Sequence, residues 1–296
     1  MTDTITQFTG VEGNALAATC YAPTKDTGKP PVVLMHGGGQ TRHSWKGGAE
    51  KLAQQGHMAF TVDARGHGDS DWVPSAQYRF QDYGQDLGAV LAQVEERTGF
   101  TPILIGASLG GLSGLAAHAL ALDAGRKVPF CALVLVDIVP KMASSGVDRI
   151  MGFMANKMSE GFARVEDAAD AIAAYLPWRE RPKSLDGLSK NLRRRDDGRY
   201  YWHWDPAFVN GPQNIMTGAE QGYGQLDQAA AAIKVPVLLI RGGKSELVTV
   251  EAAEAFLQTV PHARMADVSE AGHMVAGDKN DVFVDAVSRF LTEVSL

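Results

Sequence analysis

The sequence has few cysteines and no long apolar runs, and both features narrow what the protein can be. The two cysteines, Cys20 and Cys131, are too few for a disulfide framework or a metal cluster, and both lie in apolar runs typical of buried thiols. The longest apolar stretches, such as residues 130–136, are far too short to span a bilayer. Residues 1–10 lack a basic head followed by an apolar stretch, so we see no secretory signal and expect a cytoplasmic protein.

Basic residues are fewer than acidic ones, with 28 Lys and Arg against 34 Asp and Glu. The formal net charge of the 296 residues is −6 and the pI is about 5.8, whereas a nucleic-acid binder needs a basic face to pair with phosphates. We therefore expect no nucleic-acid partner, and the short apolar runs give no reason to expect a membrane partner. The expected partner is a small-molecule substrate, which the motifs below support. A homo-oligomer is left open.

Short apolar runs alternate with amphipathic stretches along the chain. In these runs both the odd and the even positions are apolar, so both faces of each strand are apolar. This is typical of parallel strands that helices cover on both faces. We expect strands at 31–35, 58–62, 102–105, 131–136 and 235–240, and a weaker one at 263–268. We expect helices at 44–55, 82–98, 110–123, 250–260 and 281–294, and a β-hairpin over 5–21.

One region interrupts this alternation. From about residue 140 to residue 226 no strand is evident, and the segment carries helical patterns, a basic run at 193–195 and an aromatic cluster at 200–204. We interpret 140–226 as a helical cap inserted into a core formed by 1–139 and 227–296. The basic run is interpreted as a solvated helix face.

The first chemical motif is Gly106-Ala107-Ser108-Leu109-Gly110. It follows an expected strand and opens an expected helix, which is the setting of a nucleophile elbow. The tight turn requires small residues beside the serine, and the helix N-terminus directs free N–H groups at developing negative charge. We therefore predict that Ser108 is a nucleophile.

A glycine-rich run, His36-Gly37-Gly38-Gly39, follows the strand at 31–35. Acyl transfer needs two N–H donors for the oxyanion, and glycine lets the backbone approach the substrate closely. We predict that the amides of Gly38 and Leu109 form this oxyanion hole. His36 itself is interpreted as structural.

Two further residues complete the pattern. Glu246 follows the strand at 235–240, and His273 follows the weak strand at 263–268. In open α/β sheets functional residues gather at the carboxyl ends of strands, so Ser108, Glu246 and His273 are expected to meet. Their order along the chain, serine then acid then histidine, is that of a known hydrolase triad.

These motifs together resemble the α/β-hydrolase superfamily, in its cap-bearing serine esterase and epoxide-hydrolase-like branch. The residues that carry the resemblance are 36–38, 63–70 (Asp-Ala-Arg-Gly-His-Gly-Asp-Ser), 106–110, 241–248 and 272–273. The resemblance implies a mostly parallel eight-stranded sheet with flanking helices and an inserted helical cap. It also implies a structural role for the 63–70 loop, so His67 is not expected to be the base.

The sequence departs from the family's pattern at the acid. The more usual residue after the strand at 235–240 is Asp, and this chain has Glu246. Some family members place the acid after the preceding strand instead, where this chain has Asp137. We favour Glu246 as the acid of the triad and keep Asp137 as the alternative acid. If Asp137 is not the acid, we expect it to support the site or to anchor the cap.

Several aromatic residues are candidates for substrate binding. Trp45 and Trp72 follow the oxyanion run and the 63–70 loop, and Trp202 and Trp204 lie in the cap, although core or cap packing explains each equally well. No metal or organic cofactor is expected, because no metal-ligand motif occurs and the eight histidines are scattered. Residues 242–245 (Gly-Gly-Lys-Ser) are not a phosphate loop, since Leu238 stands where its first glycine is needed.

Serine at the elbow favours attack on an acyl carbonyl, whereas the epoxide hydrolases and dehalogenases of this fold use Asp there. The expected activity is hydrolysis of carboxylic esters of small or medium, partly apolar substrates through an acyl-enzyme. Two alternatives stay open: C–C bond, lactone or perhydrolysis chemistry with the same triad, and a receptor-like protein with little turnover. The fold alone does not choose among them.

Overall fold

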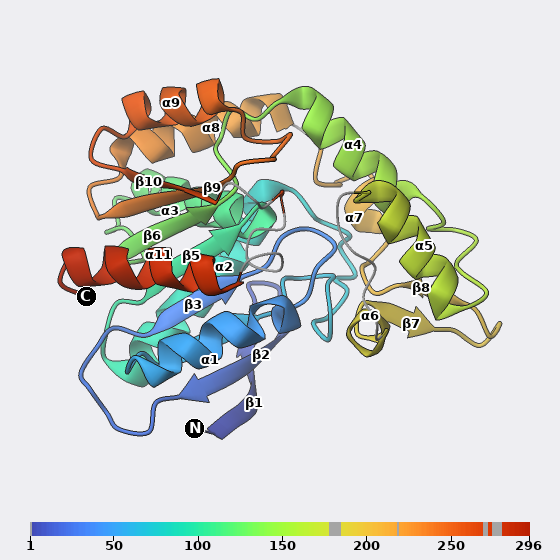
Figure 1. Cartoon of the computed structure of the whole chain (residues 1–296), viewed down its shortest axis with the longest axis horizontal. Coiled ribbons are helices and arrows are strands. Elements are labelled where there is room, and N and C mark those ends of the chain that lie inside the picture. The colour runs from blue at the N-terminus through green and yellow to red at the C-terminus, as the bar shows by residue number, and fades with distance from the viewer. Residues whose placement is uncertain (1, 178–184, 218, 269–271, 274–279) are drawn as a thin grey trace.

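The computed structural model describes residues 2–177, 185–217, 219–268, 272–273 and 280–296. Its centre is an eight-stranded sheet in the order β1-β2-β4-β3-β5-β6-β9-β10 (Figure 1). The pairs β1–β2 and β2–β4 are antiparallel, and the remaining neighbours in this sheet are parallel. The expected mostly parallel α/β fold of eight strands with flanking helices is confirmed.

The strands are β1 (Thr2–Thr9), β2 (Ala15–Ala22), β3 (Val32–Met35), β4 (Ala59–Val62), β5 (Ile103–Ala107), β6 (Ala132–Val136), β7 (Leu192–Arg194), β8 (Tyr200–Trp202), β9 (Val237–Gly242) and β10 (Arg264–Val268). The helices are η1 (Arg42–Trp45), α1 (Lys46–Gln54), α2 (Phe80–Thr98), α3 (Leu109–Asp123), α4 (Ser144–Ala155), α5 (Val165–Tyr175), α6 (Asp186–Ser189), α7 (Ala207–Asn210), α8 (Ala219–Ala232), α9 (Val250–Thr259) and α11 (Asn280–Glu293). Among the helices of the described ranges, none is both long enough and apolar enough to cross a membrane.

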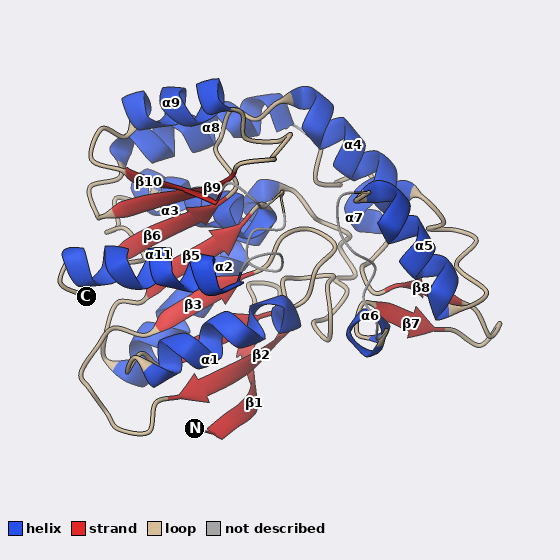
Figure 2. Ribbon diagram, viewed as in Figure 1, coloured by secondary structure: helices blue, strands red, loops and turns tan. Residues whose placement is uncertain are grey.

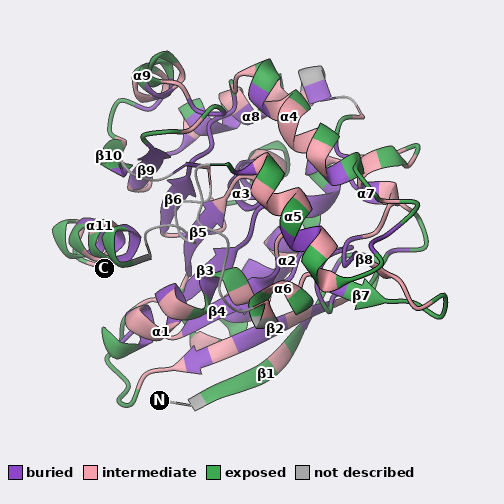
Figure 3. Cartoon of the chain, turned by 45° about the vertical axis from the view of Figure 1, so that its right-hand side comes forward, coloured by how far each residue is buried: buried purple, intermediate pink, exposed green. Residues whose placement is uncertain are grey.

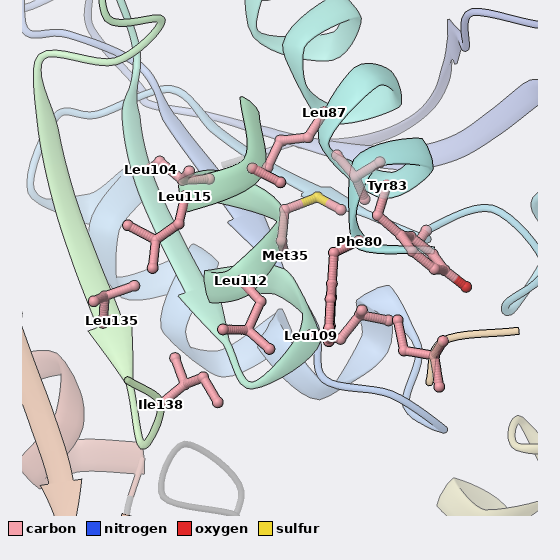
Figure 4. Packing of buried hydrophobic residues seen from close by; sticks show 14 of the residues in the cluster. Met35, Phe80, Tyr83, Leu87, Leu104, Leu109, Leu112, Leu115, Leu135 and Ile138 are labelled. Atoms are coloured by element: carbon pink, nitrogen blue, oxygen red, sulfur yellow. The ribbon is translucent and has the colours of Figure 1, made fainter. Parts of the chain in front are cut away.

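Helices cover both faces of the sheet, which explains why its strands are apolar at both parities (Figures 1 and 2). In β3, Val32 and Leu34 pack in one apolar cluster with α1 and α11, whereas Val33 and Met35 pack in a second with α2, α3 and α8. Figure 4 shows Met35 within the second cluster, beside Leu112 and Leu115 of α3. The central strands are buried, while the outer helices keep exposed faces (Figure 3).

The part of the chain from α4 to α7, between β6 and β9, lies beyond the carboxyl ends of the parallel strands (Figure 1). We call its residues 141–217 the cap segment; residues 178–184 and 218 of the predicted cap lie outside the described residues. We expected no strands in this segment, and this expectation was wrong, because β7 and β8 form an antiparallel pair. The helix expected for the basic run was also wrong, because Arg193 and Arg194 lie on β7. Strands of three residues are too short to produce a readable alternation.

The boundaries drawn between cap and core stay predictions. Helix α8 runs through the proposed boundary at 226/227, and its Leu226, Ala229 and Ala230 are buried. Leu226 and Ala230 belong to the apolar cluster that also contains α2 and α3. The packing of α8 against α2 and α3 therefore places this whole helix in the core and not in the cap.

Candidate active site

Ser108 occupies the sharp turn between β5 and α3. Its φ of 45° and ψ of −113° are strained for a residue with a side chain, and such strain gathers at functional positions. The Ser108 N–H donates to the carbonyl of Val136 at 3.2 Å, which ties the turn to the end of β6. The local geometry is therefore that of the expected nucleophile elbow.

The two glycines of the elbow are required by close backbone contacts. A Cβ on Gly110 would lie 2.5 Å from the carbonyl oxygen of Met35, and a Cβ on Gly106 would lie 2.5 Å from the carbonyl carbon of Gly110. Neither contact can be relieved by a side-chain rotation, because both involve the backbone. The pattern Gly-x-Ser-x-Gly thus follows from how tightly α3 turns back on β3 and β5.

The imidazole of His273 faces a buried carboxylate. His273 Nδ1 lies 2.7 Å from Asp137 Oδ2, and since a carboxylate only accepts, Nδ1 carries the proton that is donated. The Asp137 side chain is fully buried and that of His273 is 21% exposed. This contact leaves Nε2 of His273 free to accept a proton.

The expectation that Glu246 orients His273 is corrected by this contact. The Glu246 carboxylate is largely exposed and pairs with Arg149 of α4, while the acid in contact with His273 is the alternative, Asp137. The physical reason lies in the loop after β9, where Ser245 faces Asp137 and the next residue faces outward. Sequence order alone did not reveal which of these neighbours points inward.

Two groups of the β9 end hold Asp137 in place. Ser245 Oγ donates to Oδ2 at 2.6 Å, and the N–H of Gly242 donates to Oδ1 at 2.8 Å. Ser245 Oγ in turn accepts from the N–H groups of Leu247 and Val248, at 3.1 Å each. The sequence analysis assigned no role to Ser245, although it lies in the segment 241–248 that carries part of the family resemblance.

The proposed oxyanion donors are both available. Among the described residues, the N–H groups of Gly38 and Leu109 have no hydrogen-bond partner. Gly37 approaches Ser108 so closely that a Cβ there would lie 3.3 Å from Ser108 Cβ. Both donors line the same cavity as Ser108 and His273.

His36 supports the oxyanion run, residues 37–39, from the side of the core. The N–H of Ala64 donates to His36 Nε2 at 3.0 Å, so the ring proton is on Nδ1, which donates to the Gly37 carbonyl at 2.8 Å. Full burial lowers the pKa of His36 to about 4 and that of His67 to about 3, so both rings are neutral at pH 7. Neither histidine lines the cavity, which fits the structural roles expected for them.

An apolar cavity of about 230 Å³ opens beside Ser108 and His273. Its walls come from the elbow, the oxyanion run and the cap segment, and they include four methionines: Met142, Met151, Met154 and Met216. Among the described lining residues there is no Lys, Arg, Asp or Glu. The walls therefore suit a neutral, largely apolar ligand whose shape the flexible methionines can follow.

The four tryptophan candidates separate into two pairs. Trp202 and Trp204 line the cavity, and their rings stack at 5.0 Å. The placement of Trp45 and Trp72 in the pocket was wrong: Trp45 is buried in the core against Phe283 of α11, and Trp72 is a surface residue beside Arg193. Trp45 is close in sequence to the oxyanion run, but η1 directs its side chain away from the cavity, to the face of the sheet that α1 and α11 cover.

Comparison with known proteins identifies relatives over nearly the whole chain. The family model Hydrolase_4, described as "Serine aminopeptidase, S33", matches residues 27–280. Esterase Rv0045c of Mycobacterium tuberculosis is 28% identical over 263 residues, which cover 87% of this chain and 81% of the esterase. The sn-1-specific diacylglycerol lipase ABHD11 of Mus musculus is 28% identical over 278 residues, 90% of this chain and 82% of the lipase.

Solved structures agree with these relatives. A crystal structure of E-2-(acetamidomethylene)succinate hydrolase superposes with a TM-score of 0.80 at 20% identity, covering 98% of this chain and all of that chain, and it supports the fold alone. A structure of Rv0045c gives a TM-score of 0.69 at 25% identity and covers 98% of this chain and 92% of that chain. The elbow, the sheet order and the family match lead to one conclusion: this chain is an α/β-hydrolase enzyme and belongs to the Hydrolase_4 family.

Proposed function

We propose that the protein hydrolyses carboxylic esters of neutral, largely apolar small or medium substrates through an acyl-enzyme on Ser108. The observation that carries this proposal is the Asp137–His273 pair and Ser108 at the wall of one apolar cavity. The names of the esterase and lipase relatives support the same chemistry. The cytoplasmic location, the lack of nucleic-acid and membrane partners and the oligomeric state stay predictions.

In this mechanism His273 Nε2 removes the proton from Ser108 Oγ as the oxygen attacks the ester carbonyl. The N–H groups of Gly38 and Leu109 stabilise the oxyanion, and Asp137 stabilises the imidazolium that forms. His273 then protonates the leaving alcohol, and the acyl group stays on Ser108. Water, deprotonated by the same imidazole, releases the carboxylic acid. Ser108 and His273 line the same cavity, and hydrogen bonds between catalytic groups tighten in the substrate complex.

The lining chemistry argues against two other substrate classes that relatives' names raise. A dicarboxylate such as an (acetamidomethylene)succinate would bury its charges with no Lys or Arg among the described lining residues. An aminopeptidase substrate would bury an α-ammonium with no Asp or Glu there. Burying an unpaired charge costs several kcal/mol, so both classes are disfavoured.

The test combines turnover with covalent labelling. The unaltered chain is expected to hydrolyse p-nitrophenyl butyrate and to gain one adduct from a fluorophosphonate, and Ser108→Ala is expected to lose both. Ser113→Ala is the matched control, because Ser113 lies on α3, the helix that begins directly after Ser108, and its hydroxyl donates to the Leu109 carbonyl. Labelling without turnover on a broad ester panel would contradict ester hydrolysis and favour C–C, lactone or receptor-like alternatives.

A further inference from the structure

His203, which follows β8 in the cap segment, is buried between two loops of the core. The N–H of Gly68 donates to His203 Nδ1 at 2.7 Å. A backbone amide can only donate, so Nδ1 is unprotonated and the ring proton is on Nε2. Nε2 lies 3.2 Å from the carbonyl oxygen of Gly39, to which it donates. The two contacts together fix the tautomer of a ring that the ester mechanism does not use.

The two loops that His203 bridges differ in their other supports. The loop at Gly66–Gly68 has several ties to the cap segment: Asp205 N–H donates to the Gly66 carbonyl at 2.8 Å, and Arg193 donates to the Gly68 carbonyl. Among the described residues, the Gly39 carbonyl receives only the His203 bond. The Gly68 side is therefore an anchor, and the Gly39 side is the part that depends on His203.

Gly39 directly follows Gly38, the proposed oxyanion donor. Gly39 has a φ of 75°, and a Cβ there would lie 3.2 Å from atoms of Trp204 and Met154 in the cap segment. Two residues before Gly39 in the run, the carbonyl of Gly37 accepts from His36 on the core side. The peptide that joins Gly37 to Gly38 and bears the Gly38 N–H is thus fixed from the core by His36. The carbonyl of Gly39, at the other end of the run, is fixed from the cap segment by His203.

We propose that His203 is a positioning residue that couples the cap segment to the oxyanion hole by holding the Gly39 carbonyl. The inference rests on the proposed acyl-transfer function, and it assigns to a cap residue the alignment of the Gly38 N–H. A loop that drifts by even a fraction of an ångström loses oxyanion stabilisation that a single donor supplies in the transition state.

Burial keeps the ring of His203 uncharged, which is the form that its two hydrogen bonds require. Burial is the main cause that lowers the pKa of His203 well below its usual range, and the neighbouring His67, His36 and Arg193 lower it further. The Gly39 carbonyl acts in the opposite direction. At neutral pH the ring is uncharged, and Nδ1 can accept from Gly68.

Two substitutions of His203 by side chains of similar shape distinguish its bond to Gly68 from its bond to Gly39. In His203→Gln the terminal amide nitrogen reaches the place of Nε2 and can still donate to Gly39, whereas His203→Asn places its amide near Nδ1 and cannot reach Gly39. We expect His203→Gln to keep kcat for p-nitrophenyl butyrate within about threefold, and His203→Asn to lose 10- to 100-fold in kcat with KM nearly unchanged.

A transition-state analogue tests the link to the oxyanion. The inhibition constant of an alkyl trifluoromethyl ketone, which binds as a tetrahedral oxyanion on Ser108, should rise in His203→Asn by the factor that kcat/KM falls. The inhibition constant of the matching secondary alcohol, which forms no oxyanion, should not change. Equal losses in both variants, or a loss confined to KM and the alcohol, would overturn the proposal.

A control and a second measurement keep the proposal testable if His203→Asn does not fold. His57 is another buried histidine bound to a carbonyl, that of Pro30, and it lies at the opposite end of the sheet, before β4. His57→Asn should lower Tm without changing kcat. In the unaltered ¹⁵N-labelled chain, His203 should show a protonated Nε2 whose proton resonance moves when the trifluoromethyl ketone binds; a proton on Nδ1, or no movement, would refute the coupling.

Discussion

His273 and Asp137 come from segments 136 positions apart and meet at 2.7 Å, with the carboxylate fully buried beneath the ring. Asp137 has a positive φ of 50°, like Ser108 at the neighbouring strand end. The N–H of Asp137 donates to the carbonyl of Ile240 at 2.7 Å, which fixes this strained residue against β9. Asp137 and Ser108, the proposed acid and nucleophile, are thus both held at strained ends of adjacent parallel strands, β6 and β5.

This pairing predicts unequal effects of removing two carboxylates. Asp137→Asn should lower kcat about 10³- to 10⁴-fold, because an amide cannot stabilise the imidazolium and favours the wrong ring tautomer. Glu246→Gln should stay within about threefold, since the Glu246 carboxylate forms an exposed ion pair with Arg149. Steady-state kinetics on p-nitrophenyl butyrate, with circular dichroism to confirm folding, measures both. A larger loss in Glu246→Gln would restore the original assignment of the acid.

Ser245 should act through Asp137. Ser245→Ala removes a donor to the carboxylate and is expected to lower kcat about tenfold, the effect of one charge-assisted hydrogen bond of about 1.5 kcal/mol. Ser245→Thr keeps the hydroxyl and should retain most of kcat. The measurement is kcat at saturating ester in the three chains. Equal losses in the Ala and Thr variants would show that the hydroxyl does not matter.

Two glycines on one helix should respond oppositely to alanine. In α2, a Cβ on Gly84 would lie 2.6 Å from Ala116 Cβ and 2.9 Å from the α3 backbone, whereas a Cβ on Gly88 would meet nothing within 4 Å. We expect Gly84→Ala to lower the free energy of unfolding by about 1–3 kcal/mol through overpacking, and Gly88→Ala to raise it by up to about 1 kcal/mol through helix propensity. Urea unfolding measures both, and a stable Gly84→Ala chain would contradict the close α2–α3 contact.

The buried histidines predict loss of stability in mild acid. Burial lowers the pKa of His36 to about 4 and of His67 to about 3, from an ordinary value of 6.5. The unfolded chain therefore binds more protons than the folded one below pH 6.5. The stability due to each neutral ring is complete above pH 6.5 and is lost as the pH falls toward the folded pKa.

Between pH 7.5 and 5.5 each of these two histidines should lower the free energy of unfolding by about 1.4 kcal/mol. Urea unfolding at the two pH values measures the total change, to which the lowered pKa of His203 adds in the same direction. The imidazole ¹H–¹³C signals of the folded chain report the protonation of each ring separately. Protonation of either ring near pH 6.5 in the folded chain would contradict this account.

The sequence predicted most of the fold because its central strands are apolar at both parities and its glycines mark turns. The elbow was predictable for the same reason, since Gly106 and Gly110 are dictated by local backbone contacts. The acid was not, because Ser245 and Glu246 are neighbours on one loop and only the tertiary packing decides which faces Asp137. The short strands β7 and β8 carried no readable period.

The pocket residues were the hardest to predict. Trp45 and Trp204 are both buried aromatic residues near glycine-rich loops, and yet one packs under the sheet and the other lines the cavity. A hydrophobic side chain satisfies the same burial requirement in either place. Which place it takes depends on the path of η1 and β8, which the local sequence does not specify.

Ser245 Oγ and Asp137 Oδ2 lie 2.6 Å apart, although they come from the ends of two different strands. The side chain of residue 245 therefore reaches the same carboxylate oxygen that faces the ring of His273. Two separate strand ends converge on one point beside the imidazole, so the geometry specifies a place for an acid in space and not a position in the chain.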